Sequence, residues 1–402
     1  MDGLPSCTLL CLTRAIGPSS CSLSDLDCIC TDVQLTTEVQ TCVLLNCSVK
    51  DNLRSTRLLY DACDYPVVDD NSVFPSVAIA GAVFSTVAVG LRIAGRLLGS
   101  RMGLDDAVIA LSLVAALAMS VIGLRHAPLG LGKDIWFVLF DNITKILLLC
   151  FCIEVLYISS IALSKISMLL LFLRLFPDQN FRRATYFVLA VAFCWGVATV
   201  FATTFSCKPV SHFWHMWDGE HQCKCLSHVH IVSAHSAINI ALDVAIIGLP
   251  VSTLAKLNLP LGKKIGVCSM FAAGILVTAL SIYRFIMSLS QEMGGNITKT
   301  FIWLDTWSAL EVYLSIISVC MPGVRAFFNY SYRRFTRGVG GCEEECSTFV
   351  LGNLIDGYGT PEVGTVEDSA ERYTMRGNST GSADFATTMT AGGPACRILG
   401  PR

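Results

Sequence analysis

The sequence predicts an all-α membrane protein, in which a bundle of seven transmembrane helices carries a small, disulfide-stapled helical domain at its N-terminus. Hydrophobic residues make up 53% of the 402 residues and charged residues only 15%, against about 25% charged in a typical soluble domain. Eight of the 19 cysteines lie within the first 63 residues. Seven apolar segments are long enough to cross a bilayer: 74–98, 105–125, 144–173, 184–206, 229–255, 264–290 and 301–327.

Each of these segments meets the requirement of about 20 mainly apolar residues for a spanning helix. The third is longer than a span needs. The fifth contains Asp243 and Pro250, yet its flanks leave no other interpretation. Composition therefore divides the chain into a polar, cysteine-rich domain (1–73), the seven spans (74–327) and a tail (328–402). The tail is rich in Gly, Ser, Thr and charge, so we expect it to be disordered.

The distribution of basic residues predicts the orientation of the bundle. The loops after the first, third and fifth spans, together with the start of the tail, hold roughly twice as many Lys and Arg as the opposite loops, which is the positive-inside pattern. We therefore expect an extracellular N-terminus and a plasma-membrane location. Glycosylation triplets at Asn46, Asn142 and Asn296 fall on the same outer side. No signal peptide is visible before Cys7, so either the start is truncated or misannotated, or the first span carries the N-terminal domain across.

The cysteines of the N-terminal domain indicate a disulfide framework. An even number of cysteines in a short polar segment is typical of a domain oxidised outside the cytosol, whereas a zinc site is less favoured because the segment contains no His. Apolar residues at helical spacing in 31–47 and 51–62 predict a small helical unit, in which each bridge contributes about 2–4 kcal/mol. The spacing leaves the pairing open among Cys7, Cys11, Cys21, Cys28, Cys30, Cys42, Cys47 and Cys63.

Three features of this spacing carry a family resemblance: the opening Pro5-x-Cys7, the pair Cys28-x-Cys30 and the long last gap to Cys63. The domain resembles the fungal CFEM domain, an extracellular eight-cysteine module. The resemblance implies that haem is a candidate ligand, with Asp25, three residues before the cysteine pair, as its axial ligand. The alternative is that Asp25 caps the following helix or faces water.

Charged residues inside the predicted spans indicate a functional interior, because charges at membrane depth are costly. We predict a polar network within the bundle, against the alternative of unconnected sites. Lys165 lies close to the cytoplasmic end of its span, so we expect its side chain to snorkel to the interface. The predicted network consists of Glu154, Asp243, Arg284 and Glu311.

The loop after the fourth span contains further cysteines and histidines. We predict a disulfide between Cys207 and Cys223, with a bridge to Cys150 or Cys152 in the third span as the alternative. The histidines in and after this loop, together with Cys225, match no zinc spacing, so no metal site is predicted.

A second resemblance covers the spans. The first matching pieces are Leu91-Arg92 to Arg96 with Gly103-Leu104-Asp105-Asp106, and Lys165-Ile166-Ser167 to Leu173-Arg174-Leu175-Phe176. They are followed by Cys207-Lys208-Pro209 to Phe213-Trp214 and Cys223, and by Asn239 to Asp243 with Leu249-Pro250. The last are Ser281-Ile282-Tyr283-Arg284, and Trp307, Glu311, Cys320-Met321-Pro322 and Arg325. These pieces resemble the rhodopsin-like domain of fungal seven-span receptors related to the appressorium-forming plant-pathogen receptor family.

The resemblance implies a receptor similar to G-protein-coupled receptors, with an unknown extracellular ligand or surface as its cue, a role in host infection and a heterotrimeric G protein as a partner. The chain departs from animal receptors, because Leu173-Arg174-Leu175 replaces the Asp/Glu-Arg-Tyr triplet and no Asn-Pro-x-x-Tyr is present. We expect Arg174, Arg182 and Arg183 to contact the cytoplasmic partner; the alternative is that they only reflect the positive-inside rule.

The sequence offers less support for other functions. The main alternative is a membrane-anchored CFEM protein for haem or iron capture. A retinal protein needs a lysine in 301–327, which has none, and no internal repeat indicates a transporter. No catalytic motif indicates an enzyme, and the net charge of -2 argues against nucleic acid. Cys342 and Cys346 follow a basic stretch, which makes them candidates for palmitoylation.

Overall fold

The computed structural model describes residues 3–339, apart from 23–24, 68, 71, 100, 221–223, 255–260 and 291–295. The chain begins with four short helices: α1 (Ser6–Ile16), α2 (Leu26–Thr31), α3 (Val33–Asn46) and α4 (Val49–Ala62). Three of them start at a side chain that accepts hydrogen bonds from the free amides of the first turn. Asp25 caps α2, Asp32 caps α3 and Ser48 caps α4.

Four disulfides hold these helices together, as the cysteine pattern predicts. They join Cys7 to Cys47, Cys11 to Cys42, Cys21 to Cys28 and Cys30 to Cys63. The apolar core of this domain is small; its buried members include Ala15, Ile29 and Leu35. Because so few side chains are buried, the crosslinks supply much of the stability.

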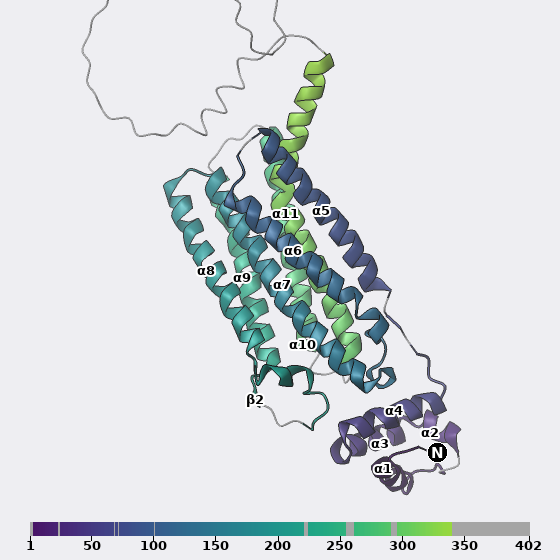
Figure 1. Ribbon diagram of the computed structural model, residues 1–402. Coiled ribbons are helices and arrows are strands. Elements are labelled where there is room, and N and C mark those ends of the chain that lie inside the picture. Colours follow the sequence, from purple (N-terminus) through teal and green to yellow (C-terminus); the bar gives the residue numbers. More distant parts are fainter. Residues whose placement is uncertain are drawn as a thin grey trace, which may run out of the picture. The chain divides into compact units, whose positions relative to one another are not determined.

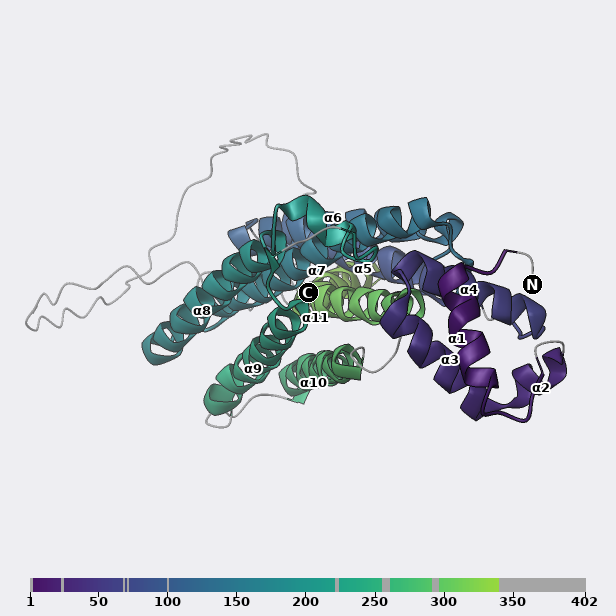
Figure 2. The same cartoon turned by 90° about the horizontal axis from the view of Figure 1, so that it is seen from below.

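Seven long helices follow, and all seven are long and apolar enough to cross a membrane. Figures 1 and 2 show them as a single bundle. Their bounds are α5 (Val73–Gly99), α6 (Leu104–Leu124), α7 (Phe140–Leu175), α8 (Gln179–Thr204), α9 (His228–Leu254), α10 (Leu261–Ser290) and α11 (Ile297–Val339). Each coincides with one predicted span, although α11 continues past residue 327, where the tail was expected to begin.

We name the two ends of the bundle after residues described below. The His126 end is where α5, α7, α9 and α11 begin, and the Arg92 end is where α6, α8 and α10 begin. Short elements lie at the His126 end: the 3-10 helices η1 (Ala127–Leu129), η2 (Ile135–Phe137) and η3 (Val210–Trp214), and the strands β1 (Cys207–Lys208) and β2 (Lys224–Cys225).

Helices α7 and α11 form the centre of the bundle. About half of the apolar window of each is buried (50% and 56%), against 22–33% for the other five. The outer helices expose large apolar side chains instead, such as Phe187, Phe193 and Phe201 of α8, as expected of surfaces that face lipid. Gly81 of α5 lies directly against the ring of Tyr313, so a side chain at that position would separate α5 from α11. The centre of the bundle is therefore where polar groups are removed from both lipid and water.

Candidate functional site

A network of buried polar side chains joins four helices in the middle of the bundle. Its central residue is Glu311 of α11, which is 1% exposed. The Glu311 carboxylate accepts hydrogen bonds from the Tyr157 hydroxyl of α7 (2.9 Å), from Asn239 Nδ2 of α9 (3.0 Å) and from the Ser281 hydroxyl of α10. Each of the three donors belongs to a different helix, so the hydrogen bonds of this one carboxylate depend on the relative positions of all four helices. We call these residues and the two pairs described next the Glu311 network.

An ion pair extends the network towards the Arg92 end. Lys165 of α7 donates to the carboxylate of Asp243 in α9, and Ser281 Oγ lies 3.4 Å from the other Asp243 oxygen. Asn239 and Asp243 are four residues apart, which places both on one face of α9. The prediction that Lys165 snorkels is therefore wrong: its side chain is 4% exposed. Helical rise gives depth along the axis, but it does not reveal that Lys165 faces a carboxylate of the neighbouring helix.

Arg284 of α10 extends the network in the other direction. Its guanidinium lies 4.1 Å from the centre of the Tyr157 ring, and its Nε donates to Ser308 Oγ at 2.8 Å. Glu154 lines a small cavity of about 40 Å³ together with Tyr157 and Arg284. Three of the four charged residues named from the sequence, Asp243, Arg284 and Glu311, thus share one set of contacts, and Glu154 lies beside them on this cavity. Tyr157 was missed, and Asn239 and Ser281 were named only as residues that match the receptor family, because a neutral polar residue within a span has no signal of its own apart from its spacing to a charge.

A second group of charges is buried at the Arg92 end. Arg92 of α5 is 1% exposed; its Nε donates to Asp106 (2.8 Å) and one terminal nitrogen to Asp105 (2.6 Å), both in the first turn of α6. Its other terminal nitrogen donates to the carbonyl oxygen of Val319 in α11 at 2.6 Å. Arg96 lies 3.4 Å from Asp105. We call these residues, with Arg174, the Arg92 cluster. From the sequence, Arg92, Arg96, Asp105 and Asp106 were recognised only as residues that match the receptor family.

Arg174 belongs to this cluster and differs from the other two predicted partner-facing arginines. It lies 3.6 Å from Asp105, donates to the Arg101 carbonyl at 2.6 Å and is about one-third exposed. Arg182 and Arg183, in the first turns of α8, are exposed. Of the three predicted arginines, Arg182 and Arg183 therefore present their charges to solvent, while Arg174 is held by Asp105.

The predicted bridge between Cys207 and Cys223 is wrong. Cys207 is bonded to Cys225, because β1 and β2 pair in antiparallel register with these two residues opposite each other. Cys223 lies outside the described residues. Cys150 and Cys152, the alternative partners, are free. The disulfide also leaves Cys225 without a thiolate for the histidines of this loop.

The N-terminal domain contains an apolar cavity of about 580 Å³. That volume suits a small organic ligand, and the lining residues include Leu12, Leu26, Val39 and Val43. Asp25 is exposed, does not line the cavity, and accepts a hydrogen bond from Cys28 N at 3.1 Å. In this arrangement the residues do not form an axial haem site, and the capping role of Asp25 is the one that its contacts fit.

The three glycosylation candidates have different surroundings. Asn46 is exposed at the end of α3. Asn142 lies in the first turn of α7, half-buried, and donates to Leu129 O at 3.4 Å. Asn296 donates to Asp134 and accepts from Ile135 N. The Asn46 side chain also donates a hydrogen bond, to Cys42 O at 2.8 Å, but Asn46 is the exposed one of the three and is therefore the best placed for modification. The palmitoylation candidates Cys342 and Cys346 lie outside the described residues.

Comparison with known families accounts for most of the chain. Residues 91–330 match the fungal rhodopsin domain, and residues 1–64 match the CFEM domain. The first match contains both the Glu311 network and the Arg92 cluster, and the second contains the eight bridged cysteines of the N-terminal domain. No solved structure matches the chain.

Three curated relatives are similar to parts of this chain. A SAT4 family membrane protein of Emericella nidulans is 26% identical over 44% of this chain and 45% of its own length. The satratoxin biosynthesis SC1 cluster protein 4 of Stachybotrys chartarum is 26% identical over 40% of this chain and 58% of its own. The fugralins biosynthesis cluster protein 2 of Gibberella zeae is 22% identical over 53% and 50%.

The chain spans about half the length of these curated relatives. The family match is broader, since it covers more than half of the chain. Together with the seven apolar helices and the bridged N-terminal domain, it shows that this multi-pass membrane protein belongs to the fungal rhodopsin domain family and carries a CFEM domain at its N-terminus.

Proposed function

We propose that the protein is a fungal plasma-membrane receptor, similar to G-protein-coupled receptors, that senses an extracellular or host-surface cue and signals to cytoplasmic partners. The observation that carries this proposal is the convergence of three helices on the Glu311 carboxylate of a fourth. A cue acts through such a bundle only if it binds one arrangement of the helices more tightly than another.

Directional contacts suit the Glu311 network to that task. A buried hydrogen bond to a charged group contributes about 1.5–3 kcal/mol, and typical coupling between two sites is about 1–3 kcal/mol. Exchanging one donor of Glu311 for another is therefore an energy change of the size that a receptor needs. An apolar core would allow the helices to shift without defining a second arrangement.

The positive charge at the Arg92 end supports the cytoplasmic placement of that end. Arg182 and Arg183 are exposed there, so we assign the partner surface to these two arginines. Arg174 stabilises the bundle instead through Asp105.

The test is capture of nucleotide-free fungal G-protein α subunits by the full chain in lipid nanodiscs. We expect the wild-type chain to capture at least one subunit and an Arg182→Ala/Arg183→Ala variant to lose most of that capture. The matched control is Arg57→Ala, since Arg57 is an exposed arginine of the N-terminal domain. Absence of capture by the wild-type chain would contradict coupling to a G protein.

The apolar cavity of the N-terminal domain favours one second candidate, a membrane-anchored protein for haem or iron capture. Titration of the full chain with hemin separates the two proposals. A Soret shift that disappears in Asp25→Ala would support haem capture. The receptor proposal expects no spectral change that depends on Asp25, because that side chain caps α2 and does not line the cavity.

A further inference from the structure

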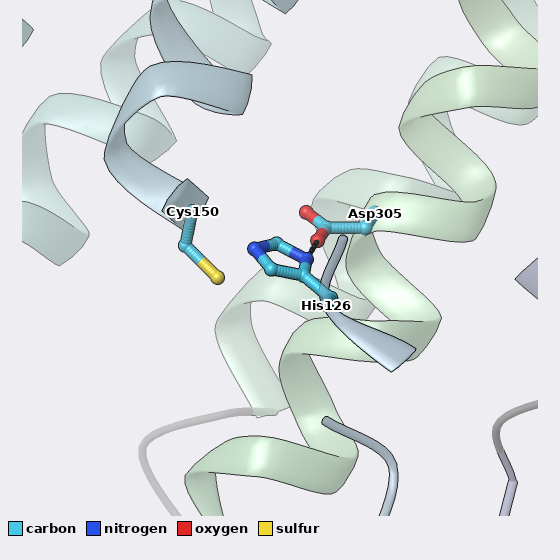
Figure 3. A group of neighbouring side chains, drawn as sticks. All are labelled: His126, Cys150 and Asp305. Carbon is cyan, nitrogen blue, oxygen red and sulfur yellow. Dashed lines mark ion pairs between the residues drawn. The ribbon is translucent and has the colours of Figure 1, made fainter. Parts of the chain in front are cut away.

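Three side chains of the kinds that bind metals meet near the His126 end of the bundle. They are His126, which follows α6, Cys150 of α7 and Asp305 of α11 (Figure 3). One ligand atom from each lies within 4.8 Å of the others, and all three residues are buried. His126 Nδ1 is 3.5 Å from Asp305 Oδ2. Figure 3 shows the Cys150 sulfur facing the other edge of the imidazole.

These groups are incompletely satisfied by the protein. His126 is 2% exposed, yet its Nε2 has no hydrogen-bond partner among the residues that the structure describes, and neither has Asp305 Oδ2. Cys150 is a free thiol. Buried polar atoms without partners are rare in folded proteins and call for an explanation. The hydrogen bonds of the Glu311 network involve none of these three side chains.

We propose that His126, Cys150 and Asp305 bind one Zn²⁺ ion. An imidazole nitrogen, a thiolate and a carboxylate are the donors that zinc uses in proteins, whereas Mg²⁺ and Ca²⁺ prefer oxygen donors alone. Bond lengths of about 2.0–2.3 Å around a tetrahedral ion imply separations of roughly 3.3–3.7 Å between ligand atoms. The imidazole–carboxylate distance already meets that requirement, and the rest of the site needs to contract by about 1 Å. One imidazole binds the ion through one nitrogen. The χ2 torsion of histidine is soft, so the ring can turn that nitrogen towards the space between the thiol and the carboxylate.

Charge and space also fit a zinc ion. On binding, Zn²⁺ replaces the thiol proton of Cys150, which is released to water. The ion, the thiolate and the Asp305 carboxylate then sum to zero charge, which suits an apolar surrounding where a net charge is costly. Cys150 and Asp305 also line the cavity of about 40 Å³ next to them, which is large enough for the single water that completes a three-ligand zinc site. Glu154 and Arg284 are the other charged residues on that cavity.

A zinc ion at this site would join the end of α6 to α7 and α11. Because the neighbouring cavity also touches Tyr157 and Arg284, the ion would stabilise one arrangement of the helices around the Glu311 network. The site itself does not depend on the receptor proposal, since it is defined by bound metal and not by signalling.

The test uses the full chain, purified in detergent, stripped with a chelator and dialysed against Zn²⁺. We expect one zinc per chain by elemental analysis. With Co²⁺ in its place we expect the thiolate-to-cobalt charge-transfer absorption of a cysteine ligand. Cys150→Ser should abolish that absorption, and His126→Gln and Asp305→Asn should each weaken Zn²⁺ binding at least about tenfold. The matched control is Cys152→Ser, which removes another free cysteine of the same helix and should change neither result.

A second measurement keeps the wild-type residues in place. The rate at which N-ethylmaleimide alkylates Cys150, followed by mass spectrometry of its peptide, should fall at least about tenfold on addition of Zn²⁺ and return with chelator, whereas Mg²⁺ should leave it unchanged. Equal rates with and without Zn²⁺ would overturn the proposal. Zinc uptake that survives Cys150→Ser would also overturn it and would place the ion elsewhere, for example among the histidines of the 207–228 loop.

Discussion

The central charges of the Arg92 cluster and those of the Glu311 network are buried among apolar side chains, but the two groups differ in how their charges are paired. In the Arg92 cluster each carboxylate faces at least two guanidinium groups, at distances of 2.6–4.0 Å. In the Glu311 network Lys165 pairs with Asp243. In the part of the chain that the structure describes, Glu311 has hydroxyl and amide donors and Arg284 has a hydroxyl and a ring as partners.

This difference indicates that the two groups have different roles in the bundle. A cluster in which every charge is neutralised several times has one favoured arrangement and resists change. A carboxylate held by neutral donors from three helices exchanges partners at lower cost than an ion pair separates, because the donor that leaves carries no charge and the other donors still hold the carboxylate. We therefore interpret the Arg92 cluster as a structural clamp and the Glu311 network as the adaptable part of the bundle.

The strongest test of the clamp is Arg92→Met. It leaves two buried carboxylates with weaker partners and the Val319 carbonyl without its side-chain donor, so we expect the free energy of unfolding to fall by about 3–5 kcal/mol. Unfolding in mixed micelles with increasing SDS would measure the loss. Arg96→Met is the matched control, because Arg96 is 18% exposed and should cost less. Equal losses for the two variants would contradict the central role of Arg92.

The Lys165–Asp243 pair should show a smaller and partly reversible effect. Lys165→Met leaves the Asp243 charge unpaired and should lower the free energy of unfolding by about 3 kcal/mol. In Lys165→Met/Asp243→Leu both charges are removed, and we expect at least half of that loss to be regained. The same SDS titration provides the measurement. A double variant less stable than either single variant would show that the pair stabilises more than an apolar replacement does.

Glu311→Gln should affect stability less and helix arrangement more. Glutamine is close in size, but its NH2 group cannot accept a hydrogen bond from Tyr157 or Ser281, so we expect a loss of about 1–2 kcal/mol. Spin labels on α7 and α10 should report a changed distribution of distances between these helices. An unchanged distribution would argue against the adaptable role of Glu311.

Arg174→Ala should have a smaller effect again. Because Arg174 is about one-third exposed and Asp105 keeps Arg92 and Arg96 as partners, we expect a loss of at most about 1 kcal/mol. This variant also tests the assignment of the partner surface, since it should retain more G-protein capture than Arg182→Ala/Arg183→Ala. Complete loss of capture by Arg174→Ala would show that Arg174 also belongs to the partner surface.

Substitution of the glycosylation candidates should have the smallest effect on the free energy of unfolding. If the N-terminus is extracellular, Asn46→Gln should remove a glycan and shift the mobility of the protein on a gel. Asn296→Gln should leave the mobility unchanged, because the Asn296 side chain is engaged with Asp134 and Ile135. Absence of any glycan on the wild-type chain would remove this support for an outer N-terminus.

The sequence predicts the spans well, because lipid imposes the same requirement on every helix: length, low charge and a satisfied backbone. It also predicts the buried charges Asp243, Arg284 and Glu311, because a charged side chain within an apolar span is costly and therefore indicates a polar interior. It does not predict which helix supplies the partner. Lys165 was misplaced in this way, and the group of His126, Cys150 and Asp305 was missed because its members are far apart in the chain and meet only when α6, α7 and α11 pack.

The pairing of Cys207 illustrates the other limit. Cys223 and Cys225 are two residues apart, and either would close a loop of similar length. The choice depends on the register of β1 against β2, which sets Cys225 opposite Cys207. Local spacing contains no information about that register. The eight cysteines of the N-terminal domain have the same property: their spacing identifies the family, while the pairs follow from how α1 to α4 fold.

The bond from Arg92 to the Val319 carbonyl affects the course of the last helix. Pro322 lies within α11 and cannot donate the backbone hydrogen bond that an ordinary residue would make to the preceding turn. The turn that Arg92 contacts is the one weakened by this proline, so a side chain of α5 helps to set the direction in which α11 leaves the bundle. Any movement of α5 against α6 would consequently change the direction of the final turns of α11.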